Sequence, residues 1–145
     1  LDVGSNAGYF GIYLSKKVSK IIGIEIDKKF HRQAIFLKRL FSRYMNLDNH
    51  IIINGDVNRF NSIINEVNII ILSKVIYHKN LDGNQVDLLD KLLKKNIKTI
   101  FLQGHTTQGY MGNLTYMKKI LKKNQFKIIF ENKHYEYPIL VGRRN

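Results

Sequence analysis

Short runs of apolar, often β-branched residues alternate along the chain with longer segments in which apolar residues recur at helical spacing. The apolar runs predict strands over residues 1–3, 20–26, 50–54, 67–72 and 97–102. The other segments predict helices over residues 9–17, 28–44, 58–65, 84–95 and 113–123. Alternation of strands and helices is typical of an α/β domain with a mostly parallel sheet.

The first two helical segments show apolar residues at helical spacing. In the first helix, Phe10, Tyr13 and Leu14 stand at positions i, i+3 and i+4, the spacing that identifies the segment as helical. In the second helix, lysine and arginine occupy one face, so we expect the opposite apolar stripe to lie against the sheet. That stripe consists of Phe30, Ala34, Leu37, Leu40 and Phe41.

The end of the chain breaks this alternation. Two apolar runs, 126–131 and 135–142, are separated only by Asn132, Lys133 and His134. A connection of three residues is too short for a parallel crossover, so the two strands are expected to pair as an antiparallel hairpin.

Composition limits the classes of protein that this chain can represent. Its 145 residues, of which 44% are hydrophobic, suit one domain with a single core. The absence of cysteine excludes a disulfide framework, a cysteine-ligated zinc site and a thiol nucleophile. The five histidines lack ligand spacing, so no metal site is predicted. No apolar run is long enough to span a membrane.

The sequence begins inside a strand, at Leu1, without a targeting segment. We therefore expect residues 1–145 to form one cytoplasmic domain that lacks N-terminal residues.

The charge admits two interpretations. Lysine and arginine number 24 against 11 acidic residues, which gives a formal net charge of +13. Lysine supplies 18 of these 24 residues, and Ile, Lys and Asn together fill 54 of the 145 positions, as AT-rich codon usage would give. The charge can thus mark a nucleic-acid partner for the lysine-rich surface or merely follow from composition. The scarcity of arginine favours composition, because planar bidentate phosphate recognition favours arginine.

Candidate chemistry lies at the carboxyl ends of the predicted strands, where open α/β sheets bind ligands. The first strand runs into the turn 2–8, in which Gly4 and Gly8 let the backbone approach a ligand. The dinucleotide fingerprint G-x-G-x-x-G would need glycine at Gly4, Asn6 and Tyr9, and only one of these positions matches. An NAD-linked oxidoreductase is therefore disfavoured.

Acidic residues follow the second and third strands. Glu25 ends the second strand about 20 residues after the glycine turn, a place that suits the vicinal hydroxyls of a ribose. Asp27 stands where the cap of the next helix belongs. After the third strand, Asp56 can accept a hydrogen bond from an exocyclic amine of adenine, with the N–H of Val57 donating to a ring nitrogen. Alternatively, Asp56 only caps the following helix.

Taken in order, these segments resemble the class I S-adenosylmethionine (SAM)-dependent methyltransferases. The resemblance covers essentially the whole chain and includes the terminal hairpin. Its motifs are LDVGSNAGYFG at 1–11, IIGIEID at 21–27, NGDV at 54–57, IIILSKVIYH at 69–78 and IKTIFLQG at 97–104. It implies a three-layer αβα sandwich around a mostly parallel seven-stranded sheet, in the order 3-2-1-4-5-7-6, with an antiparallel C-terminal hairpin.

The resemblance also implies SAM as the cofactor and assigns residues to it. The glycine turn resembles the family's G-x-G-x-G, with Asn6 in the middle position, which asparagine can fill in an ordinary or a left-handed conformation. The family's cofactor-binding positions correspond here to Asp2, Gly4, Ser5, Asn6, Gly8, Glu25, Ile26, Asp56, Val57 and Ser73. Among these, Asp2 and Gly4 would lie at the methionine portion, Glu25 at the ribose, and Ile26, Asp56 and Val57 at the adenine.

The segment after the fourth strand limits the classes of methyl acceptor that we expect. Ser73 is followed by Lys74 and Val75, not by the Pro-Pro of the amino-methylating DNA enzymes. Cytosine-C5 enzymes need a cysteine, and the 2′-O-methyltransferase tetrad needs an aspartate at position 73. We expect an oxygen or nitrogen atom of a small molecule, a nucleoside or RNA as the acceptor. The candidates for catalysis are Ser73, His78 and His105, although either histidine can equally be a hydrogen-bonded loop residue.

Two functions therefore stay open. The first is methyl transfer from SAM to an unidentified acceptor. The second is a non-catalytic SAM- or RNA-binding module of the same fold.

Overall fold

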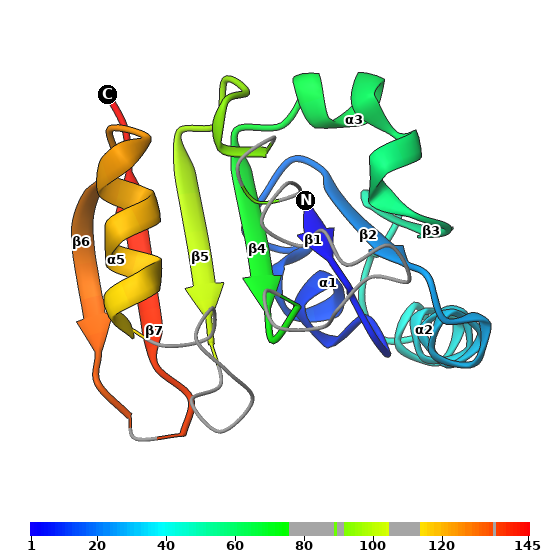
Figure 1. Ribbon diagram of the computed structural model, residues 1–145. Coiled ribbons are helices and arrows are strands. Elements are labelled where there is room, and N and C mark those ends of the chain that lie inside the picture. Colours follow the sequence, from blue (N-terminus) through cyan, green and yellow to red (C-terminus); the bar gives the residue numbers. More distant parts are fainter. Residues whose placement is uncertain (76–88, 90–91, 105–113, 135) are drawn as a thin grey trace. The chain divides into compact units, whose positions relative to one another are not determined.

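The computed structural model describes residues 1–75, 89, 92–104, 114–134 and 136–145. The strands are β1 (Asp2–Val3), β2 (Ile21–Glu25), β3 (His50–Asn54), β4 (Ile69–Ser73), β5 (Thr99–Gln103), β6 (Lys127–Asn132) and β7 (Ile139–Arg143). The helices are α1 (Tyr9–Leu14), α2 (Lys28–Phe41), the 3-10 helix η1 (Val57–Arg59), α3 (Asn61–Asn65) and α5 (Leu114–Lys123). The strands form one mixed sheet in the order β3-β2-β1-β4-β5-β7-β6 (Figure 1).

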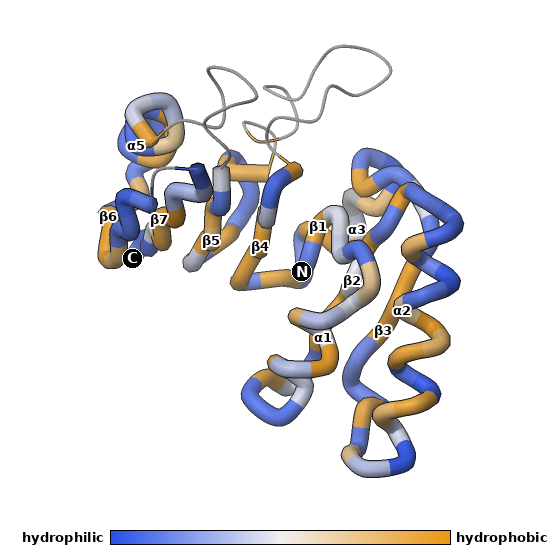
Figure 2. Tube along the Cα trace, turned by 90° about the horizontal axis from the view of Figure 1, so that it is seen from below, coloured by the Kyte–Doolittle hydropathy of each residue, from blue (hydrophilic) through white to orange (hydrophobic). Residues whose placement is uncertain are grey.

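Residues 1–61 form a first compact unit around parallel strands. β2 pairs in parallel with both β1 and β3, and its carboxyl end, Glu25, stands opposite Asn54. Helices α1 and α2 contact each other and the strands β2 and β3. Every residue of β2 is buried, and Ala34 of α2 is completely covered. Figure 2 shows hydrophilic and hydrophobic stretches alternating along α2, as an amphipathic surface helix requires.

Residues 62–145 form a second compact unit that contains the antiparallel pairs. β4 and β5 are parallel, whereas β7 runs antiparallel to both β5 and β6. Helix α5 packs on β6 and β7 (Figure 1). Leu121 lies against the backbone of Gly142. The core combines α5 with the strands and includes Ile70, Leu72, Ile100, Leu102, Met117, Leu121 and Leu140.

The strand order and the antiparallel hairpin confirm the predicted fold class. The boundaries of the hairpin differ, because β7 begins at Ile139 and not at residue 135. The backbone N–H groups of Glu136 and Tyr137 turn towards Nδ1 of His134, both at 3.3 Å. Pro138, which has no N–H for a strand ladder, comes next. The connection between the two strands is consequently longer than predicted.

Helix α1 is present, but the aromatic residues whose spacing predicted it do not form its buried face. Tyr13 is 68% exposed and Phe10 is also exposed, while Gly11 and Ile12 are the buried residues. The cause is His50, whose ring fills the space beside Gly11, so the helix turns its smallest residue towards the sheet. In α2 the stripe holds at Ala34, but the helix ends at Phe41, before the predicted residue 44.

Other predictions differ in detail or fall outside the described residues. The expected helix over 58–65 is divided into η1 and α3. Most of the helix expected over 84–95 lies outside the described residues. Among the helices that the structure describes, none combines the length and the apolar character needed to cross a membrane.

Candidate functional site

The turn after β1 is built from three residues in the left-handed region of backbone conformation. Gly4, Asn6 and Gly8 have φ values of 67°, 51° and 78°. Asparagine tolerates this region better than most residues, and Oδ1 of Asn6 accepts a hydrogen bond from the N–H of Ala7 at 2.7 Å. The left-handed conformation allowed for Asn6 by the sequence is therefore confirmed.

Glu25 holds this turn against the end of β2. Its Oε2 accepts a hydrogen bond from the N–H of Asn6 at 2.7 Å, and its Oε1 accepts one from the N–H of Asp27 at 2.8 Å. The turn is also fixed at its start, because the N–H groups of Gly4 and Ser5 both donate to the carbonyl of Ile24. A buried carboxylate that accepts two backbone N–H groups is well satisfied and stays in place.

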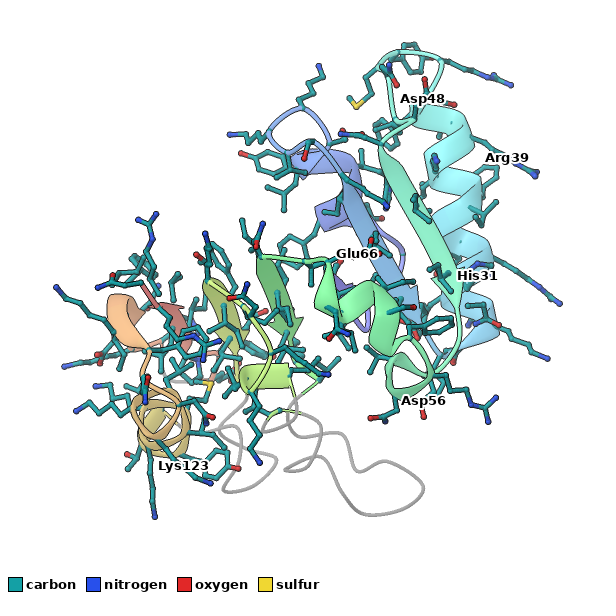
Figure 3. The ribbon with its side chains drawn as sticks, turned by 90° about the horizontal axis from the view of Figure 1, so that it is seen from above. His31, Arg39, Asp48, Asp56, Glu66 and Lys123 are labelled. Carbon is teal, nitrogen blue, oxygen red and sulfur yellow. The ribbon has the colours of Figure 1, made fainter. Side chains whose placement is uncertain are left out.

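The segment after β3 is hydrogen-bonded to the end of β2, at Glu25. Nδ2 of Asn54 donates to the carbonyl of Glu25 at 2.8 Å, and the N–H of Gly55 donates to that carbonyl at 3.0 Å. Asp56 follows directly, at the position labelled in Figure 3. Its Oδ1 accepts hydrogen bonds from the N–H and the Nδ2 of Asn58, so it caps η1. Asp56 therefore acts as a helix cap, which is one of the two roles that the sequence predicts for it. Its Oδ2 takes no part in these two hydrogen bonds.

Asp27 is a helix cap, as the sequence predicts. Its Oδ1 accepts hydrogen bonds from the N–H groups of Lys29 and Phe30 at the start of α2.

The two hydrophobic candidates, Ile26 and Val57, differ in exposure. The side chain of Ile26, between Glu25 and Asp27, is 64% exposed and can cover a flat ligand. Val57 is buried, so its side chain belongs to the core and only its backbone can serve a ligand.

Asp2 is the most unusual titratable group of the described residues. It is 1% exposed, and its Oδ2 has no hydrogen-bond partner within the part of the chain that the structure describes. Burial raises the pKa of Asp2 to about 7; the α-ammonium group of Leu1 opposes this shift and Glu25 adds to it. Oγ of Ser5 is likewise buried without a partner among the described residues.

The structure adds His50, which the sequence showed only as the first residue of a strand. The His50 ring is buried, and neither ring nitrogen has a partner among the residues described. Burial, and to a lesser extent Lys38, lowers the pKa of His50 to about 4, so the ring is neutral near pH 7. A Cβ at Gly11 would lie 2.0 Å from its Nε2, which means that the ring supports the helix following the turn.

In the second unit, Ser73 ends β4 next to β5. Its hydroxyl donates to Oε1 of Gln103 at 2.5 Å, and the oxygen keeps its capacity to accept a hydrogen bond. Lys74 follows with a φ of 60°, and its Nζ lies 4.2 Å from the ring centroid of Tyr137. The other candidates for catalysis, His78 and His105, lie outside the described residues.

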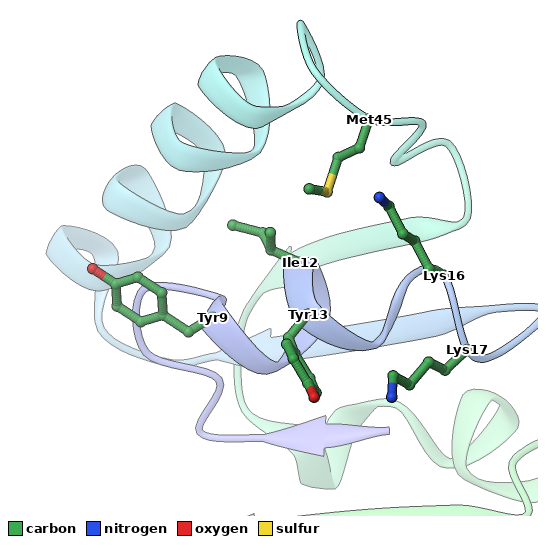
Figure 4. A pocket seen from close by; sticks show the side chains of 6 residues that line it. All are labelled: Tyr9, Ile12, Tyr13, Lys16, Lys17 and Met45. Carbon is green, nitrogen blue, oxygen red and sulfur yellow. The ribbon is translucent and has the colours of Figure 1, made fainter.

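A hollow of about 570 Å³ opens beside α1 (Figure 4). It is lined by Tyr9, Ile12, Tyr13, Lys16, Lys17 and Met45. Nζ of Lys17 lies 5.3 Å from the ring centroid of Tyr13, within the range of a cation–π contact. The exposed tyrosines were not anticipated, because their helical spacing resembles that of a buried stripe.

In the first unit, these contacts bring together the predicted residues of the glycine turn, Glu25 and the segment 54–57. A pair of buried carboxylates beside a tight glycine turn can bind hydroxyl groups and a cationic group of a ligand. An exposed isoleucine at the same strand end adds an apolar surface.

Comparison with known proteins supports the fold. No protein-family model and no curated protein sequence matches this chain. Among solved structures, the magnesium protoporphyrin IX methyltransferase of Synechocystis PCC 6803 with bound SAM is 18% identical, with a TM-score of 0.75. That match covers 99% of this chain and 68% of the other.

Two further structures match in the same way. The N-terminal domain of EvdMO1 with S-adenosylhomocysteine (SAH) bound is 14% identical, with a TM-score of 0.74 over 99% of this chain and 73% of the other. A SAM-dependent methyltransferase from Aquifex aeolicus is 17% identical, with a TM-score of 0.72 over 97% of this chain and 79% of the other. The chain therefore has the Rossmann-like α/β fold found in SAM-dependent methyltransferases.

Proposed function

We propose that this chain binds SAM and transfers its methyl group to an oxygen or nitrogen atom of a small molecule, a nucleoside or RNA. Residues 1–145 would form the cofactor-binding domain. The observation that carries the proposal is the carboxylate of Glu25, which joins the glycine turn to the carboxyl end of β2. When bound, SAM supplies an electrophilic methyl group on a sulfonium.

The Glu25 carboxylate suits a ribose diol. A carboxylate offers about four acceptor positions, and the two backbone N–H groups of Asn6 and Asp27 use one position on each oxygen. Each oxygen retains a further position for a hydroxyl donor. Because both oxygens are already oriented, little ordering is needed when the ligand binds.

Asp2 suits a cationic group. Its buried Oδ2, without a partner among the described residues, is an acceptor that a ligand ammonium group would satisfy. A cation beside Asp2 would also offset the burial that raises its pKa to about 7. Gly4, Ser5, Asn6 and Gly8 would line the same end of the ligand.

The adenine would lie on the exposed side chain of Ile26, with Oδ2 of Asp56 accepting from its exocyclic amine and the N–H of Val57 donating to a ring nitrogen. Asn54 and Gly55 both donate hydrogen bonds to the carbonyl of Glu25. These two bonds support the arrangement, because they hold the segment 54–57 beside the end of β2.

For the acceptor, the candidates remain Ser73, His78 and His105. Ser73 is held by Gln103, so its oxygen is oriented to accept a hydrogen bond from a ligand. Methyl transfer depends chiefly on positioning and exclusion of water, and a general base is not obligatory. The names of similar structures support both acceptor classes, because one specifies a porphyrin and another a tRNA.

Titration calorimetry with SAH tests the cofactor. We expect micromolar binding to the wild type, a loss of at least tenfold in Glu25→Ala, and a smaller loss in Asp56→Ala. The control is Glu66→Ala, which removes an exposed carboxylate elsewhere and should leave SAH binding unchanged. Circular dichroism of each variant ensures that only folded protein is compared.

Unchanged affinity in both folded variants would show that the site is assigned wrongly. Protection from thermal unfolding by NAD but not by SAM would instead support the oxidoreductase that the glycine spacing disfavours.

A further inference from the structure

Helix α2 presents a row of cations away from the strands. Lys29, Arg32, Phe36, Arg39 and Arg43 are all exposed and follow one another at intervals of three or four residues. This spacing places the first four on one face of α2, and Arg43 follows in the turn just beyond the end of the helix at Phe41. Figure 3 shows Arg39 extending away from β2 and β3. We call these five residues the α2 stripe.

The positive charge of the α2 stripe is not balanced locally. The sequence contains no acidic residue between Asp27 and Asp48, and Asp27 accepts hydrogen bonds from the helix backbone. Across the described ranges, the ion pairs found involve Glu131 with lysines of the second unit and none of the stripe cations. The stripe therefore presents cationic side chains to an external partner.

Arginine is concentrated at this place. The chain has only 6 arginines against 18 lysines, yet three of the 6 lie on the α2 stripe. A composition rich in lysine explains scattered lysines but not a row of arginines. The guanidinium group binds phosphate oxygens through two parallel hydrogen bonds, which a lysine cannot do. From Arg32 to Arg39 the helical rise is about 10 Å, and Arg43 extends the row into the turn after α2, so more than one phosphate fits along it.

An aromatic ring stands within the row. Phe36 is 64% exposed and lies between Arg32 and Arg39 in the stripe. An exposed ring among cations is the combination with which proteins bind single strands, because bases stack on the ring while phosphates pair with the cations. The hollow beside α1 repeats this combination in Tyr13 and Lys17.

The other face of α2 argues against a membrane surface as the partner. Ala34 is completely buried, and α2 contacts β2, β3 and α1. Interfacial helices insert their apolar face into the lipid. Here that face is already packed, and Phe36 and Leu40 are the large apolar side chains left exposed in the helix.

We propose that the α2 stripe binds a single-stranded segment of RNA, with phosphates on Arg32, Arg39 and Arg43 and a base stacked on Phe36. This surface is distinct from the residues proposed to bind SAM. RNA binding is thus expected with or without the cofactor.

Fluorescence anisotropy with a labelled single-stranded RNA of 20 mixed nucleotides tests this, at 50 to 200 mM salt. The triple variant Arg32→Gln, Arg39→Gln, Arg43→Gln should bind at least tenfold more weakly, and its salt dependence should be shallower by about two units of slope. Phe36→Ala should weaken RNA binding roughly fivefold or more and leave the dependence of affinity on salt concentration unchanged. Replacing the three arginines by lysine should give an intermediate loss if bidentate contacts matter.

The matched control removes three charges from the second unit, through Lys119→Gln, Lys122→Gln and Lys127→Gln, which are also exposed. Equal losses in both triple variants, or none in the α2 variant, would overturn the proposal. Tighter binding of anionic phospholipid vesicles than of RNA, lost in the α2 variant, would point to a membrane surface instead. SAH titration of the α2 variant separates the two proposals, since its affinity should equal that of the wild type.

Discussion

At the scale of single residues, Glu25 organises its surroundings through backbone contacts. Among the contacts that the structure describes, its two oxygens accept hydrogen bonds from the N–H groups of Asn6 and Asp27. Asn6 lies 19 residues before Glu25 in the sequence, and Asp27 lies two residues after it. The sequence suggested a carboxylate for a ligand at this position. It could not show that the same carboxylate holds the glycine turn, because that contact depends on how β1 and β2 pair.

Asp2 gives a prediction about pH. Its pKa rises from 3.8 to about 7 on folding, so the folded state holds the proton more tightly and the stability conferred by this group falls as pH rises from about 4 to 7. Asparagine imitates the protonated form. Asp2→Asn should therefore be as stable as the wild type near pH 4 and more stable above pH 7, by on the order of 4 kcal/mol or less.

Urea unfolding of both proteins at pH 4.5 and pH 8 measures this difference. His50 titrates in both proteins alike, so its contribution cancels. The same stabilisation at both pH values would contradict the raised pKa of Asp2. A gain in stability at pH 8 accompanied by weaker SAH binding would be the expected pattern for a ligand-binding group.

The remaining residue predictions show where sequence reasoning succeeds. The cap at Asp27 and the conformation of Asn6 depend on a few neighbouring residues, and both are confirmed. Asp56 caps η1, and its contact with adenine stays a prediction. The burial of His50 depends on packing between α1 and β3, which no local pattern records.

At the scale of elements, α1 and β3 approach so closely at Gly11 and His50 that no side chain fits between them. The His50 ring occupies the place that a side chain at position 11 would need. The spacing of Phe10 and Tyr13 predicted the helix but does not indicate its buried face, because both aromatic residues are exposed. A glycine in the middle of a helix was the signal that could have indicated the close approach.

Gly11→Ala tests this packing. Alanine favours a helix over glycine by about 1 kcal/mol, so an open site would become more stable. Here the added Cβ would meet a rigid ring, and we expect a loss of about 1 to 3 kcal/mol in the free energy of unfolding.

A double-mutant cycle with His50→Ala provides the control. The substitution at Gly11 should be much less costly once the ring is gone. Additive effects of the two substitutions in denaturant unfolding would contradict the contact.

At the scale of the whole molecule, the sequence pattern indicated the class of the sheet, and the order of the seven strands came from the family resemblance. Alternating apolar and helical segments indicate a parallel sheet, and the short final connection indicates an antiparallel pair. Strand ends shifted by one or two residues, and β7 by four, because pairing register and Pro138 determine them and apolar runs do not. The candidates His78 and His105 fall outside the described residues and remain predictions.

The net charge of +13 also looks different at this scale. Codon usage remains one interpretation of the lysines, whereas three of the six arginines lie in the α2 stripe together with an exposed phenylalanine. The total charge is thus less informative than the place of the rarer cation.

Transfer of label from SAM carrying a tritiated methyl group tests the central claim most directly. The protein is incubated with fractionated cell extract, and the small-molecule, RNA and protein fractions are counted. We expect label in one fraction with the wild type, and none above background with folded Glu25→Ala. Tight SAH binding without label in any fraction, or label that persists in Glu25→Ala, would contradict the account.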